Sequence, residues 1–242
     1  VAESVEQVSD TEYIFKIRPN VKFHNVAPVN GRNVTAEDVV YSYERFRDLP
    51  NALNNDFFKQ YVDKMEAVDP QTFRLTTKVP YADTFYSLGG SNGFGVQAAI
   101  VAREDVEARG DLGNGGVGSG PFIIDTYVKG ERAVLKRNPD YWDPNLPYLD
   151  EWTQQIILDQ QTLLQAYKSG QIDIQAATIT KLDFAELERN DDFVNMRMPA
   201  MYHASFGMNV SVPPFNDPRV REAIYIGIDR KQFIDKVFQG EA

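Results

Sequence analysis

The chain has 242 residues, 43% of them hydrophobic and 25% charged, which is typical of a globular protein with one large domain or two modest ones. Its 25 Lys and Arg against 35 Asp and Glu give a net charge of −10, so binding to nucleic-acid phosphates is not expected. The absence of cysteine excludes disulfides, thiolate catalysis and cysteine-based zinc sites.

The first half of the chain predicts alternating strands and helices. Residues 11–18 alternate in polarity and predict a half-buried strand with one face formed by Tyr13, Phe15 and Ile17. Thr35 and Asp38 resemble a capping box that starts a helix from about Ala36 to Arg47, with an apolar stripe of Val39, Val40, Tyr43 and Phe46. Further predictions are a short helix within 51–61, a hairpin over 65–77, and helices over 80–88 and 103–109, the last ended by Gly110.

The second half predicts a hairpin followed by mixed elements. Residues 122–128 and 133–137 read as two strands that reverse at Lys129-Gly130, and Asn138-Pro139 ends the second. Beyond it we expect strands at 153–158, 172–174, 193–198 and 203–209, and helices at 162–169, at 180–189, from Pro218 and from Asp229. This alternation favours a mixed α/β (α+β) fold.

Patterns that suggest catalysis or cofactors are weak. Gly113, Gly115 and Gly118 fit G-x-G-x-x-G, but Pro121 and a strand follow where a dinucleotide site needs a helix. The two histidines, His24 and His203, are far apart in sequence, and we interpret each as structural or surface. The acids of residues 140–151 lack EF-hand spacing. We therefore predict no catalytic residue, no metal site and no cofactor.

Several motifs in a fixed order resemble those of one protein family, the family 5 extracellular solute-binding proteins, which are peptide-, nickel- and oligopeptide-binding subunits of ABC importers. The segments that carry the resemblance are Val1–Ser4, Tyr13–His24, Val34–Arg45, Gly118–Phe122, Arg137–Trp142, Ser169–Asp173 and Pro213–Ala223 with Ile228–Arg230. Three features depart from the pattern: Val5 replaces a common Trp, residues 25–33 lengthen a turn, and the chain is about half the family's length.

The resemblance implies a periplasmic-binding-protein-like type II fold, as one lobe plus the start of the second. It divides the chain into a smaller, incomplete subdomain (1–118), a core lobe segment (119–205), and a hinge crossing with the first, truncated helices of the second lobe (206–242). The chain is then an internal fragment whose signal sequence lies outside it. Its location would be extracytoplasmic, in the periplasm or as a cell-surface lipoprotein.

The function implied is binding by closure of two lobes around a peptide or similar small solute, for delivery to a membrane permease of an ABC importer. The protein would be a monomer, would not bind nucleic acid and would not be an enzyme. An alternative is a peptide sensor or chaperone of the same fold that takes no part in transport. A hydrolase using His24 or His203 is a third class, for which we expect no turnover.

The resemblance also places ligand-binding residues, namely Tyr41, Asn92, Phe94, Ala177, Thr178, Tyr202 and Asn209. Tyr41 lies about 100–200° away from the apolar stripe of its helix, which favours a ligand-facing over a core position. Phe94 is either a mobile loop tip or an aromatic lid. Asn209 either contacts ligand or caps the hinge turn, and we favour the cap. Gly118–Trp142 is interpreted as scaffold.

Overall fold

The computed structural model describes residues 1–50, 52, 55–89, 99–113, 115–174, 181–196, 205–237 and 240. The chain is a mixture of helices and antiparallel strands, as predicted. It divides into two compact units, Val1–Ile156 and Ile157–Ala242. The predicted domain boundaries after residues 118 and 205 stay predictions.

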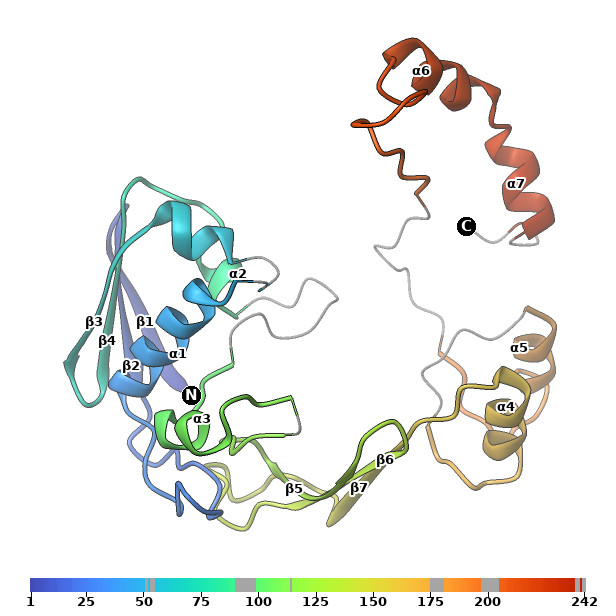
Figure 1. The fold of residues 1–242 in the computed structure, drawn as a ribbon. Coiled ribbons are helices and arrows are strands. Elements are labelled where there is room, and N and C mark those ends of the chain that lie inside the picture. The colour runs from blue at the N-terminus through green and yellow to red at the C-terminus, as the bar shows by residue number, and fades with distance from the viewer. Residues whose placement is uncertain are drawn as a thin grey trace. The chain divides into compact units, whose positions relative to one another are not determined.

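The first unit begins with a four-stranded antiparallel sheet. Its order is β1-β2-β4-β3, with β1 at Ala2–Ser9, β2 at Glu12–Ile17, β3 at Val62–Asp69 and β4 at Thr72–Thr77. Helix α1 (Ala36–Asp48) packs on β3 and β4 (Figure 1). Burial of Tyr13, Ile17, Val39, Tyr43, Phe73 and Leu75 forms the core between helix and sheet. The predicted strand, helix and hairpin in this region are confirmed.

Strand β1 was not predicted. Its two valines, at positions 5 and 8, do not follow a two-residue period, and all of its residues are exposed. The strand forms because β2 pairs with it, and the register shifts near both of its ends. A strand exposed on both faces needs no polarity alternation, so the usual signal is missing.

Three short helices complete the packing around α1. A π-helical turn covers Phe57–Tyr61, α2 covers Thr84–Gly89, and α3 covers Arg103–Arg109 as predicted. Gly110 ends α3 with a positive φ of 78°, a conformation that glycine adopts at little cost. A second buried cluster next to α3 consists of Val21, Phe23, Val29, Val34, Ala102 and Val117.

The predicted hairpin is present as the start of a second sheet. Strands β5 (Phe122–Val128) and β6 (Arg132–Arg137) pair antiparallel and reverse through Gly130, whose φ is 79°. Strand β7 (Glu151–Gln155) adds to β6, so the strand predicted at 153–158 begins and ends earlier. After β6, Trp142 packs against the second buried cluster, and Arg18 covers its ring at 4.3 Å.

The second unit contains helices α4 (Gln160–Lys168), α5 (Lys181–Leu187), α6 (Pro218–Gly227) and α7 (Arg230–Val237). Asp159 caps α4 and Asp217 caps α6, in which Pro218 occupies the first turn as predicted. No strand occurs in the described part of this unit, so the predicted strands are wrong at 172–174, 193–196 and 205–209. Short segments with a few apolar or β-branched residues form strands only where a partner strand satisfies their backbone hydrogen bonds.

None of the helices in the described ranges has the length and hydrophobicity that a bilayer crossing requires.

Candidate functional site

The start of α1 fixes the position of the predicted ligand residue Tyr41. The Thr35 capping box is present, with the Asp38 carboxylate accepting hydrogen bonds from Thr35 N at 2.9 Å and Thr35 Oγ1 at 3.0 Å. Val39 and Tyr43 point into the core, whereas Tyr41 is only half-buried. The structure therefore agrees with the prediction that Tyr41 lies off the apolar stripe. A ligand role for Tyr41 stays a prediction.

The chain returns to α1 beside Tyr41. The buried Ser42 hydroxyl donates to Asp38 O at 2.6 Å and accepts from Val101 N at 2.9 Å. Two residues later, the Arg103 guanidinium carbon lies 4.7 Å from the centroid of the Tyr41 ring. Because Ser42 and Val101 are held together, the segment that starts α3 is fixed against the helix that carries Tyr41.

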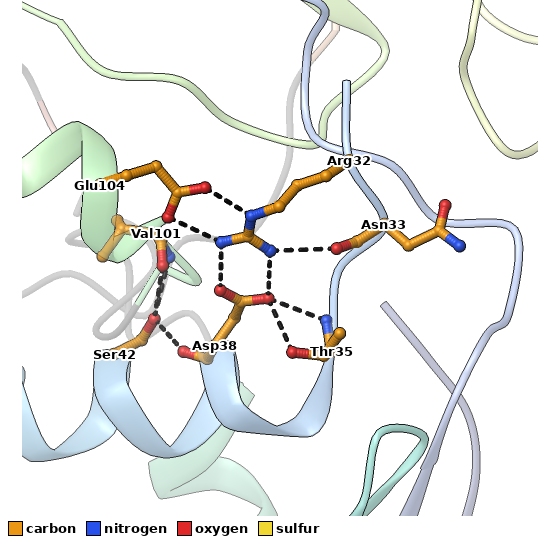
Figure 2. A network of polar contacts seen from close by, with 7 residues as sticks. All are labelled: Arg32, Asn33, Thr35, Asp38, Ser42, Val101 and Glu104. Atoms are coloured by element: carbon orange, nitrogen blue, oxygen red, sulfur yellow. Dashed lines mark hydrogen bonds and ion pairs between the residues drawn. The ribbon is translucent and has the colours of Figure 1, made fainter. Parts of the chain in front are cut away.

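Arg32 crosslinks these elements (Figure 2). Its guanidinium donates to Asp38 through Nη1 at 2.8 Å and Nη2 at 2.7 Å, and to Glu104 through Nη2 at 2.9 Å and through Nε. The hydrogen bonds from Arg32 to Asp38 and Glu104 raise the pKa of the guanidinium, and the bond from Arg32 lowers the pKa of Glu104. The network joins the loop before α1 to both α1 and α3. It was not predicted.

The remaining predicted ligand residues are mostly outside the described ranges. Asn92, Phe94, Ala177, Thr178 and Tyr202 all lie in segments that the structure does not describe. Asn209 is described and exposed, and its Oδ1 accepts from Ser211 N at 3.0 Å. This contact caps a local turn, and both the hinge-turn role and the ligand role of Asn209 stay predictions. The structure thus describes two of the seven residues, and they lie in different units.

His24 is a structural residue of the first unit. It is 6% exposed, its backbone N donates to Gly118 O at 2.7 Å, and its ring Nε2 lies 3.0 Å from Gly120 O. Asn138 Nδ2 donates to the same Gly120 carbonyl at 3.0 Å. The glycine-rich segment that fits G-x-G-x-x-G thus leads into a bend at Gly118 and Gly120. His24 and Asn138 hold this bend through their hydrogen bonds. The structural interpretation of His24 fits these contacts.

A shallow cavity of about 100 Å³ lies next to His24, lined among others by Arg109, Gly116 and Ile124. This volume holds a few water molecules and is well below the roughly 300–1,000 Å³ typical of small-molecule sites. None of the predicted ligand residues lines it. We do not assign it to the ligand site.

Acid should weaken the fold through His24. Burial lowers the pKa of His24 below its usual value, and the hydrogen bond to Gly120 opposes this shift only in part. The unfolded chain therefore binds a proton at higher pH than the folded chain. The stabilisation is fully present above about pH 6.5 and is lost as the pH falls through the lower, folded pKa.

We expect the unfolding free energy of the wild type to fall more steeply between pH 7 and pH 5 than that of His24→Gln. Urea titrations at several pH values measure both curves, and the glutamine variant removes the titrating ring while keeping an amide donor. Parallel curves for the two proteins would contradict this role of His24.

The described residues show no metal-binding arrangement. No group of three or more His, Asp or Glu side chains there is placed to hold an ion. The acids of residues 140–151 make other contacts: Asp143 accepts from Asn145 N at 3.0 Å, and Asp150 pairs with Arg137 at 3.0 Å. Asp143 thus bonds within its own turn, and Asp150 forms an ion pair with the strand β6 residue Arg137.

The described residue around Tyr41 that sequence reasoning missed is Arg103. Nothing in the sequence around Arg103 indicates a role at the site, because its contact partner Tyr41 lies 62 positions earlier in the chain (103 − 41 = 62). A search for cations near predicted aromatic site residues could find it only with the fold in hand.

Comparison with known proteins gives a consistent result. A family model described as "Bacterial extracellular solute-binding proteins, family 5 Middle" matches residues 1–242. The glutathione-binding protein GsiB of Escherichia coli (strain K12) is 29% identical over 231 residues, which are 95% of this chain and 43% of that protein. This chain thus spans less than half the length of that relative.

Solved structures show the same fold. The periplasmic binding protein DppA from Helicobacter pylori, in complex with the peptide STSA, has a TM-score of 0.81 and 25% identity, covering 99% of this chain and 49% of that one. MoaA from A. tumefaciens R10, in complex with mannopinic acid, has a TM-score of 0.80 and 27% identity, covering 97% and 46%. These likenesses confirm the predicted periplasmic-binding-protein-like type II fold class.

Proposed function

This chain belongs to the bacterial extracellular solute-binding proteins of family 5, and from that premise we propose that it forms part of the substrate-binding subunit of an ABC importer. The observation that carries the proposal is the family match over all 242 residues. The relatives GsiB and DppA are both described as binding proteins.

The mechanism that we propose is capture by closure. Two lobes hold a solute between them, and the closed form docks on a membrane permease. A ligand that contacts both lobes binds the closed state more tightly than the open state, and this difference in binding free energy shifts the equilibrium towards the closed state. Capture of this kind breaks no covalent bond. We assign the contribution of the first unit to the Tyr41 surface of α1 and propose contacts from Asn92, Phe94, Ala177, Thr178, Tyr202 and Asn209.

We propose a small solute that carries a carboxylate, with a short peptide as the leading candidate. The relatives GsiB, DppA and MoaA bind glutathione, a peptide and mannopinic acid, and each of these three compounds has a carboxylate group. Peptides of two to five residues are the range that we would test first.

Three further features belong to this proposal. Family 5 proteins are extracellular or periplasmic, and we propose either a periplasmic form or a lipoprotein on the cell surface. The subunit acts as a monomer and does not bind nucleic acid, in line with its net charge of −10. Its subdomains are residues 1–118, 119–205 and 206–242.

Native mass spectrometry of the full-length protein tests the function. We expect a copurifying solute, released on denaturation, and recovery of binding when that solute is added back. Residues 1–242 alone should bind it at least about 100-fold more weakly, because part of the contact surface is then missing.

Two results would count against the proposal. A full-length protein that neither copurifies with a solute nor binds peptides would contradict the binding function. Micromolar or tighter binding by residues 1–242 alone would contradict capture between two lobes. Binding without uptake by cells that carry the neighbouring permease genes would favour the sensor or chaperone alternative.

A further inference from the structure

Arg103 and Tyr41 form a cation–π pair on the surface of the first unit. Arg103 is the first residue of α3 and is exposed, and its guanidinium carbon lies 4.7 Å from the centroid of the Tyr41 ring. This contact with the ring is not a hydrogen bond to an acceptor atom, so the guanidinium keeps N–H groups that can bind a ligand. Those N–H groups match the geometry of a carboxylate, which they can bind through two parallel hydrogen bonds.

The acidic neighbours of Arg103 are already paired with other groups. Glu104 accepts from Arg32, while Asp105 accepts from Arg109 Nε at 2.6 Å and from Val117 N at 2.8 Å. Within the described ranges of this acidic chain, Arg103 has no carboxylate in an ion pair with it. A positive charge in the first turn of a helix is also unfavourable for the helix dipole. Local helix stability therefore does not account for an arginine at this position.

The two residues are mounted on rigid elements. Helix α1, which carries Tyr41, is anchored by Val39 and Tyr43, whose side chains are buried in the core. On the other side, Ala102 is fully buried and Val101 is bonded to Ser42, so the residues before Arg103 are fixed. Figure 2 shows Glu104, the residue after Arg103, held by Arg32. Little conformational entropy is lost when such a preorganised group binds a ligand.

We propose that Arg103 binds a carboxylate group of the captured solute, with Tyr41 as the platform that orients the guanidinium. This inference rests on the proposed solute-binding function and extends it, because it names the chemical group that the first unit recognises. Tyr41 contacts the solute only at the edge of this subsite and acts mainly as a positioning residue for Arg103.

The test uses the full-length protein and isothermal titration calorimetry. The probes are glutathione and a set of peptides of two to five residues with free carboxylates, together with the same compounds as carboxyl amides. Arg103→Gln is expected to weaken binding of the free acids about 10- to 100-fold, the range for a hydrogen-bonded charge. Arg103→Lys should recover part of this loss, because it keeps the charge but not the paired donors.

A matched control is available in the same unit. Arg18 lies over the Trp142 ring at 4.3 Å, so Arg18→Gln removes one positive charge and one cation–π contact at another place. This variant should bind the free acids like the wild type. Amide probes should bind the wild type and Arg103→Gln equally, and circular dichroism spectra of the variants should match.

The outcomes separate this inference from the function on which it rests. If the wild type binds a probe and Arg103→Gln binds it equally well, the carboxylate subsite is wrong and the binding function stands. The carboxylate subsite is also overturned if Arg103→Gln loses the same affinity for the acid probes and for the amide probes. A copurifying solute without a carboxylate overturns it as well. A protein that binds neither a copurifying solute nor any probe overturns both.

Discussion

Arg32→Met is expected to lower the unfolding free energy by about 2–3 kcal/mol. The Asp38 side chain is 7% exposed and loses both charged hydrogen bonds from Arg32, while Glu104 loses its partner as well. Breaking a fully buried pair costs about 3–5 kcal/mol, and the smaller figure follows because Arg32 is itself 37% exposed and Asp38 keeps its bonds to Thr35. Urea denaturation measures the change.

An exposed ion pair provides the control. Arg219 bonds to Asp217 at 2.6 Å with its side chain 87% exposed, so Arg219→Met should cost less than about 1 kcal/mol. Arg32→Lys should lie between the wild type and Arg32→Met, since one ammonium cannot serve both carboxylates with paired donors. If Arg32→Met and Arg219→Met lower the unfolding free energy equally, the network in Figure 2 does not hold the loop, α1 and α3 together.

Phe73→Ala should have a larger effect, a loss of about 3–5 kcal/mol. Phe73 is 1% exposed in the centre of the first sheet, where its ring lies 5.6 Å from Phe15 and 5.7 Å from Tyr43. Removal of the Phe73 ring leaves a cavity between the sheet and α1. The backbone of the paired strands around this cavity cannot move in to fill it. The loss should appear in urea denaturation of the first unit.

Tyr148→Ala is the control for Phe73→Ala. Tyr148 is 83% exposed, so its truncation should change the unfolding free energy by no more than about 0.5 kcal/mol. A loss below about 1 kcal/mol for Phe73→Ala would mean that α1 does not pack on the sheet as described. Because Tyr41 lies on this helix, Phe73→Ala should also weaken solute binding indirectly.

Local features of the sequence predicted elements whose stabilising contacts lie within a few residues. The capping box of Thr35 and Asp38 spans four positions, and Gly110 ends α3 through a backbone bond to Val106. Alternation in residues 11–18 predicted the strand that the structure shows as β2 (Glu12–Ile17), because one face of that strand is buried. Family motifs spread along the chain also identified the fold class. In each case the necessary information was local or was repeated along the chain.

Contacts between distant segments could not be predicted in this way. β1 lacks a buried face and forms because β2 pairs with it, whereas the β-branched residues at 172–174 remain outside any strand. Arg32 and Glu104 are separated by 72 positions and His24 and Gly120 by 96, and no local pattern selects these partners.

The same distinction between local features and contacts of distant segments applies to the candidate site. The sequence by itself determined that Tyr41 lies off the apolar stripe, since helical periodicity fixes the direction of each side chain around α1. Only the tertiary structure decided that the Arg103 guanidinium lies over the Tyr41 ring and that the acids beside Arg103 bond to other groups. These pairings depend on how α3 packs against α1, which is set by the buried contacts of Ser42 and Ala102 and not by residues adjacent in the chain.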